Sequence, residues 1–129
     1  MNQYEADDSV IRIRPVRITD AETIYLAIRE SILELSTWMV WAHPGYSMQD
    51  TLEFVHGAEE AWAKETEFTF AIVDHWSGKF LGTVGLNQIN RQYQMCNLGY
   101  WVRTTETGRG LGARGTHLAA RFGLRELGL

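Results

Sequence analysis

The residues best suited to bind a ligand lie together in the stretch TGRGLGARG, residues 107–115. An apolar run precedes this stretch and a helical pattern begins at Leu111, so the glycines occupy a turn between a strand and a helix. The first amides of a helix lack internal acceptors, and the helix dipole makes that end partially positive. Glycines let an anion approach these amides, and Arg109 and Arg114 add charge. The stretch therefore predicts a phosphate-binding loop, with a flexible turn as the alternative.

Residues 110–115 also spell G-x-G-x-x-G, the fingerprint of dinucleotide-binding folds. That fingerprint requires a parallel βαβ unit and an acidic residue about twenty positions later. The segments before the loop have the pattern of an antiparallel meander, and only 14 residues follow Gly115. The sequence therefore does not support a dinucleotide site.

Hydrophobic periodicity outlines the elements that would position this loop. Alternation predicts a strand over residues 11–16, and helical spacing predicts a helix from residue 21, with Asp20 as its cap. Residues 36–47 form an aromatic passage that we expect to be a loop. Ser47 and Asp50 then resemble a capping box, which opens a helix ending near Lys64.

The second half changes to the period of a strand. We expect strands near residues 68–72, 80–89 and 95–102, and a helix from Leu111. Gly99 lies inside the third of these strands and indicates a bulge or a close backbone approach. The order predicts an α/β (α+β) domain with antiparallel hairpins at its centre.

Composition limits the class of protein. The chain has 129 residues, of which 45% are hydrophobic and 22% charged, as in a single globular domain. No run approaches the roughly 18 apolar residues of a membrane span, and the acidic N-terminus lacks the features of a signal peptide. One cysteine forms no internal disulfide, and the four histidines show no metal-ligand spacing. We expect a cytoplasmic protein without a metal or a membrane partner.

Charge is divided unevenly along the chain. Residues 1–75 contain 14 acidic and 5 basic side chains, whereas residues 76–129 contain 2 acidic and 7 basic ones. Either charged surfaces merely segregate, or the basic half meets an anion and the acidic half a cation. A nucleic-acid-binding protein would be more basic overall than this chain, whose net charge is −4, so we expect no nucleic-acid partner.

Three segments in order resemble the GNAT superfamily of acetyl-CoA-dependent N-acetyltransferases: GTVGL at 82–86, NLGYWV at 97–102 and GRGLG at 108–112. The start of the chain, its TWMVWA stretch and the helix opening SMQDTLEFV are similar to the branch that contains the ribosomal-protein N-terminal (alanine) acetyltransferases. The resemblance extends from about residue 10 to the end. It implies the GNAT fold, a mostly antiparallel mixed sheet flanked by helices.

The resemblance also implies a reaction and a set of site residues. An amine, such as the N-terminus of a ribosomal protein, a small amine or an antibiotic, would attack acetyl-CoA directly in a ternary complex. The cofactor would be held by Trp101, Val102, Arg103, Gly108, Arg109, Gly110, Leu111, Gly112, Ala113 and Arg114. The acceptor groove would be lined by Trp38, Trp41, Tyr46 and Tyr100.

The chain departs from the family pattern at three places. Thr107 stands where the signature has Gln or Arg, and Asn97 stands at a catalytic position where many relatives have Glu. Asn is not a base, so the amine proton must leave through water or another residue. The family domain also continues with a strand, a helix and a hairpin, so we expect residues 1–129 to be the N-terminal and central portion of one such domain.

The open end of the sheet leads to a second interpretation. Without further strands, the segment 98–102 is an exposed edge, which a homodimer would cover. A non-catalytic acyl-CoA-binding or dimerisation module is therefore the alternative to an enzyme.

Overall fold

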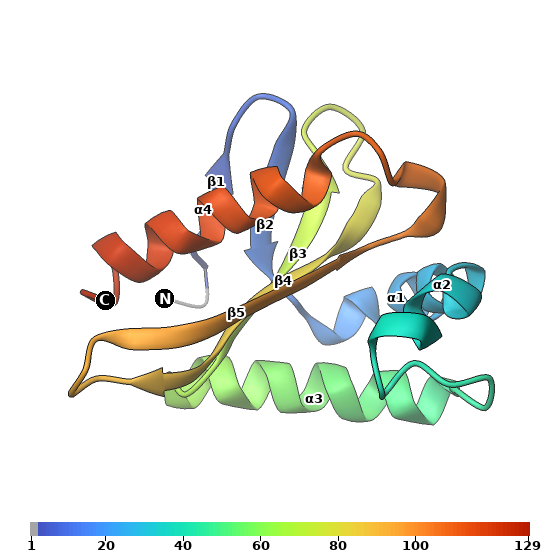
Figure 1. Cartoon of the computed structure of the whole chain (residues 1–129), viewed down its shortest axis with the longest axis horizontal. Coiled ribbons are helices and arrows are strands. Elements are labelled where there is room, and N and C mark those ends of the chain that lie inside the picture. Colours follow the sequence, from blue (N-terminus) through green and yellow to red (C-terminus); the bar gives the residue numbers. More distant parts are fainter. Residues whose placement is uncertain (1–2) are drawn as a thin grey trace.

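The computed structural model describes residues 3–129 as one five-stranded sheet with helices on both faces (Figure 1). The strands follow the order β1-β2-β3-β4-β5, and every recorded pairing is antiparallel, which confirms the α+β expectation. The elements are β1 (Ala6–Asp7), β2 (Ile11–Pro15), α1 (Ala21–Glu30), α2 (Ile32–Trp38), α3 (Met48–Lys64), β3 (Phe68–Asp74), β4 (Phe80–Asn90), β5 (Met95–Val102) and α4 (Leu111–Arg125).

The sheet separates two apolar clusters. In Figure 1, α4 lies over one face of the sheet and α3 over the other, with α1 and α2 beside the N-terminal end of α3. Phe70 and Ile72 point into the cluster that contains Phe122 of α4, whereas Ala71 and Val73 point into the cluster that contains α1. Alternate residues of β3 are therefore buried on opposite faces, which explains why this strand is apolar nearly throughout.

The predicted capping box at the start of α3 is confirmed. The Ser47 hydroxyl accepts a hydrogen bond from the Asp50 amide at 3.2 Å, and the Asp50 carboxylate accepts one from the Ser47 amide at 2.8 Å. These two bonds satisfy amides that the helix leaves without partners. They also hold the aromatic passage against the N-terminus of α3.

Asp20 occupies the predicted N-cap position of α1, but it does not cap the helix through its side chain. Its carboxylate makes no capping bond to that helix. It accepts two bonds from the Arg14 guanidinium, at 2.8 and 2.9 Å, and one from the Arg17 amide at 2.8 Å. Burial opposes the charge on Asp20, but these hydrogen bonds outweigh it, so the pKa of Asp20 lies below its ordinary value. The residue thus fastens β2 to the turn before α1.

The pairing of β4 with β5 differs from the expectation at Gly99. Gly99 lies opposite Gly85 in regular register, and the register shift falls between Asn87 and Asn90, so the predicted bulge is wrong. The close backbone approach occurs instead at Gly82, where a Cβ would overlap the carbonyl oxygen of Trp101. The outer edge of β5 pairs with no strand among residues 3–129.

Four short elements were not predicted from the sequence: β1, α2 and the 3-10 helices η1 (Ile18–Asp20) and η2 (Thr104–Glu106). The two-residue strand β1 pairs with β2, and α2 occupies the start of the passage expected to be a loop. Only Leu35 of α2 is buried, so its pattern carries little helical periodicity.

We predict that Asp20→Asn lowers the free energy of unfolding by on the order of 1–3 kcal/mol at pH 7, because it leaves the Arg14 guanidinium without its counter-charge. The depressed pKa means that this stabilisation exists above the pKa of the unfolded chain and is lost as the pH falls through the folded value. Urea unfolding at pH 7 and below pH 4 measures the effect. Glu60→Gln, which removes an exposed partner of Lys64, is the control and should change nothing measurable.

Candidate active site

The glycine loop has the geometry of an anion cradle. Gly108 and Gly110 adopt left-handed backbone conformations with φ of 86° and 70°, which favour glycine. Gly110 is the N-cap of α4 and offers no side chain to the helix amides. Within residues 3–129, the amides of positions 108–113 donate no hydrogen bond. The turn therefore presents a set of unpartnered donors at the positive end of a helix.

Both arginines of the loop are paired with carboxylates. The Arg109 guanidinium donates to Glu106 at 2.6 Å, and Lys79 donates to the same carboxyl group at 2.8 Å. These two cations, Lys79 first, hold the pKa of Glu106 below its ordinary value. Arg114 donates to Asp8 at 2.9 Å, which connects α4 to the turn between β1 and β2. Each guanidinium remains partly exposed, at 49% and 44%, so each has further donors that face solvent.

Gly112 and Leu111 attach the loop to the rest of the domain. Leu111 is 2% exposed and belongs to the core beneath α4. Gly112 is buried, and a Cβ there would overlap the ring of Tyr100 on β5. This glycine is therefore required for packing of the helix against the strand, whereas the side chain of Ala113 is exposed.

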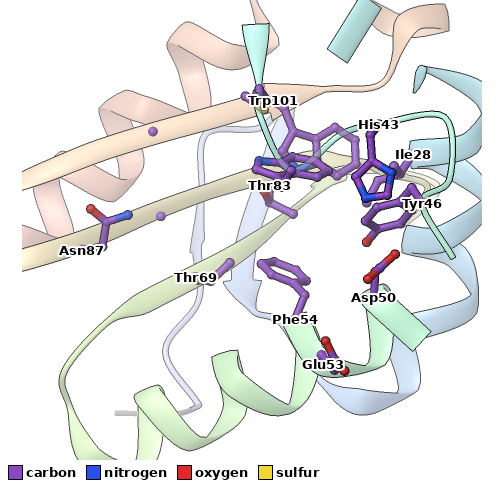
Figure 2. Close-up of a pocket in the computed structure, with 14 residues that line it drawn as sticks. Ile28, His43, Tyr46, Asp50, Glu53, Phe54, Thr69, Thr83, Asn87 and Trp101 are labelled. Atoms are coloured by element: carbon purple, nitrogen blue, oxygen red, sulfur yellow. The ribbon is translucent and has the colours of Figure 1, made fainter. Parts of the chain in front are cut away.

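A cavity of about 640 Å³ lies on the face of the sheet opposite α4, and Figure 2 shows its lining. Its floor consists of small side chains on β3, β4 and the edge strand β5, and its walls come from α1, α3 and the passage after α2. The floor residues are Thr69, Thr83, Gly85 and Gly99, and the aromatic wall residues are Trp41, Tyr46, Phe54 and Trp101. Small residues on the strands thus leave the space that the aromatic side chains enclose.

The charged groups of this cavity are acidic. Among the described lining residues, Asp50 and Glu53 are carboxylates, His43 is an imidazole, and none is lysine or arginine. Figure 2 shows His43, Tyr46 and Asp50 gathered at one end and Asn87 at the other. Hydrogen bonds from the Ser47 amide and hydroxyl, with a smaller contribution from the charge of His43, lower the pKa of Asp50. The cavity is therefore suited to a cation.

A second cavity, of about 510 Å³, lies between α2 and the C-terminal end of β5. Trp38, Tyr100, Val102 and Thr107 line it, so it extends from the strand edge to the start of the glycine loop. Met39 and Trp101 line both this cavity and the acidic one. The two spaces therefore meet at the end of β5.

The structure divides the four predicted acceptor residues between these cavities. Trp41 and Tyr46 line the acidic cavity, where the Trp41 ring lies 5.8 Å from Tyr46 and 6.3 Å from Trp101. Trp38 and Tyr100 line the second cavity beside the glycine loop. The Tyr46 hydroxyl hydrogen-bonds to Thr51 at 2.8 Å, so this residue also closes the core.

Asn97 and Arg103, which were also predicted to belong to the site, make hydrogen bonds to other parts of the fold. The Asn97 amide donates to Asn87 across the strand pair at 3.0 Å, and Asn97 lines neither cavity. The Arg103 guanidinium donates to Glu30 at 2.5 Å and to the Phe80 carbonyl at 3.0 Å. These bonds fasten the start of the loop to α1 and β4. The backbone of Arg103 is engaged as well, because its amide donates to the Leu81 carbonyl at 2.8 Å and its carbonyl accepts from the Glu106 amide at 2.9 Å.

Sequence reasoning missed the contribution of α3. Asp50 was interpreted only as a cap, and Glu53 and Phe54 were not singled out. Asp50, Glu53 and Phe54 lie within two positions of the apolar residues Leu52 and Val55 on the same helix. Acidic residues next to the buried stripe of a helix were the signal that could have identified them.

No group of three or more His, Cys, Asp or Glu side chains in residues 3–129 is placed to hold a metal ion. None of the helices in the same range has the length and apolar character required to cross a bilayer.

Comparison with known proteins agrees with the geometry. The family model described as "Acetyltransferase (GNAT) domain" matches residues 11–129. The chain belongs to the GNAT acetyltransferase family. It is therefore an acyltransferase domain of the acetyl-CoA-dependent N-acetyltransferase type, and members of this family bind acetyl-CoA.

Individual relatives span more than this chain does. It is 27% identical over 123 residues to the Bacillus subtilis protein named "Probable N-acetyltransferase YjcK", covering 92% of the chain and 67% of that protein. The crystal structure of ribosomal-protein-S5-alanine acetyltransferase from Vibrio fischeri superposes with a TM-score of 0.83 at 20% identity, covering 98% of this chain and 70% of that one. The self-immunity acetyltransferase MccE, solved with acetyl-CoA and AMP, gives a TM-score of 0.79 at 20% identity, covering 94% and 66%.

We predict that Gly110→Asp lowers the affinity for acetyl-CoA at least 100-fold, because it places a negative side chain among the amides of the cradle. Calorimetric titration of the folded variant measures the change. Gly128→Asp is the matched control, since Gly128 also has a positive φ, of 71°, and open space around it but lies beyond the other end of α4. Equal losses in both variants would argue against the assigned cradle.

Proposed function

We propose that the chain transfers the acetyl group of acetyl-CoA to a primary amine that enters through the acidic cavity, and that this amine is the N-terminus of a protein such as a ribosomal protein. The observation that supports this proposal is the meeting of two different cavities at Trp101. Asp50 and Glu53 line the first, and the second, which is lined by Glu34, leads to the glycine loop. An amine and a thioester brought from the two sides would come together at the end of β5.

The glycine loop and β5 are the parts of the chain that would hold acetyl-CoA. The unpartnered amides of residues 108–113 fit a pyrophosphate, and the unpaired edge of β5 offers backbone groups to the amides of the pantetheine arm. Bound acetyl-CoA supplies the activated acetyl group. The backbone near Trp101 and Val102 would then orient the thioester and polarise its carbonyl.

The choice of acceptor rests on charge and on the named relatives. A primary amine is a cation at neutral pH, and Asp50 and Glu53 face the cavity through which it would enter. One of the similar structures is named for acetylation of alanine on ribosomal protein S5. The segments at the start of the chain and before α3 that resemble the branch of ribosomal-protein acetyltransferases also support a protein N-terminus as the acceptor.

A second candidate function is acyl-CoA binding or dimerisation without catalysis. The engagement of Asn97 with Asn87 supports it, because neither amide accepts a proton at neutral pH. The open edge of β5 supports it too, since a second copy of the chain would cover that edge.

Calorimetric titration of the chain with acetyl-CoA, followed by a transfer assay, tests the proposal. The assay would use alanine- and serine-initiated peptides, the same peptides with a blocked N-terminus, and putrescine. Saturable binding with transfer only to free amines would agree with the proposed enzyme. Binding without any transfer would favour the second candidate, and mass measurement in solution would show whether the chain dimerises.

We predict that Glu53→Gln raises KM for the amine several-fold while leaving the Kd for acetyl-CoA unchanged, because the carboxylate attracts the ammonium form of the acceptor. Steady-state kinetics at low and high salt measures this effect, which should shrink as salt screens the charge. Glu60→Gln on the same helix, outside the cavity, serves as the control. An unchanged KM in Glu53→Gln would exclude Glu53 from acceptor binding.

A further inference from the structure

The acidic cavity contains a single imidazole. We infer that His43 is the general base of the transfer reaction and accepts the proton that the amine must lose before it attacks. The inference rests on the proposed function, because it assumes that the amine enters this cavity. Asn97, the catalytic position that the sequence suggests, is not a base and lines neither cavity, so the chain needs a base elsewhere.

The position of His43 suits this role. Its side chain lines the acidic cavity at the same end as Tyr46 and Asp50, and Trp101 of β5 lines the wall that both cavities share (Figure 2). A Cβ at position 45 would come within 3.3 Å of the ring nitrogen Nδ1, so Gly45 leaves room for the imidazole. Neither ring nitrogen has a hydrogen-bond partner among residues 3–129. Both remain available to an acceptor or to water.

The other titratable groups of the cavity are less suitable. The Asp50 carboxylate accepts two bonds from Ser47, which lower its pKa and make it a weaker base. The Tyr46 hydroxyl is bonded to Thr51, and burial raises its pKa. Glu53 is exposed, and its carboxylate accepts a hydrogen bond from the Gln49 side chain at 3.4 Å. Imidazole titrates closest to neutral pH and is the commonest general base in enzymes.

The surroundings of His43 combine both signs of charge. Asp50 and Glu53 of α3 line the same cavity, and the Arg29 guanidinium of α1 donates to the carbonyl of Pro44, the next residue in the chain, at 2.9 Å. The floor of the cavity contributes threonines, glycines, Asn87 and Trp101, which do not titrate near neutral pH.

One general base is enough to account for the protons that the amine loses in the reaction. The acceptor arrives as R–NH₃⁺ and gives one proton to His43, which releases it to solvent because the side chain is exposed. The neutral nitrogen forms a C–N bond to the acetyl carbon, and the C–S bond breaks. The second proton lost from nitrogen ends on the departing CoA thiolate, which leaves as the thiol. No oxidant, reductant or metal enters this balance.

The pH dependence of kcat in His43→Gln tests the inference. The assay would use an alanine-initiated peptide, or putrescine if no peptide is acetylated, since both are largely protonated at pH 7. We expect kcat at pH 7 to fall about 100-fold or more and the acidic limb of the profile to disappear, with an unchanged Kd for acetyl-CoA. His56 lies on an exposed part of α3 outside the cavity, so His56→Gln should retain both the wild-type kcat and the acidic limb of the pH profile.

A second acceptor separates a chemical role from a structural one. Hydroxylamine is already neutral at pH 7, so its acetylation needs no base before attack and should survive in His43→Gln. The assignment of His43 would be overturned if His43→Gln lowered kcat equally for both acceptors. It would also be overturned if the acidic limb of the pH profile disappeared in Glu53→Gln and not in His43→Gln. In either case the proposed function would stand. Wild-type protein that binds acetyl-CoA but acetylates none of these amines would overturn both.

Discussion

The close approach of β4 and β5 at Gly82 is the constraint on which the candidate site depends. The carbonyl oxygen of Trp101 lies where a Cβ of residue 82 would be, so no other amino acid fits there without separating the strands. One residue beyond Val102, the Arg103 amide and guanidinium bond to the Leu81 and Phe80 carbonyls of the same strand. The C-terminal end of β5 is therefore held firmly. This end of β5 contains Trp101, which lines both cavities, and the glycine loop follows it in the chain.

The two sides of the site use different kinds of chemistry. Around the glycine loop the available groups are backbone amides, and the nearby arginines are already paired with Glu106 and Asp8. In the acidic cavity the available groups are side chains, which α3 and the passage after α2 bring over a floor of small residues. A backbone cradle depends on the conformation of the turn more than on its side chains, whereas in the proposed function the side chains of the acidic cavity would determine which amine is accepted.

The uneven distribution of charge along the chain has a spatial counterpart. The acidic half contributes α1 and α3, which enclose one cavity, and the basic half contributes the loop and α4. Ion pairs such as Arg114 with Asp8 and Arg103 with Glu30 cross between the halves. The segregation is therefore partly neutralised within the fold, and what remains exposed lies where a cation and an anion would enter from different sides.

Local patterns of residues account for the elements with simple hydrophobic periodicity and for the position of the glycine loop. The period-two strands, the capping box at Ser47 and the loop before Leu111 depend on residues close together in the chain, so local patterns predict them. The tertiary structure alone decided that Asp20 pairs with Arg14, that Gly82 rather than Gly99 makes the close contact, and that Trp38 and Trp41 belong to different cavities. It also brought His43, Asp50 and Glu53 together with Trp101, although about 50 residues separate them from it in the sequence. Strand register and the packing of helices onto the sheet set these contacts, and neither is encoded in the spacing of residues along the chain.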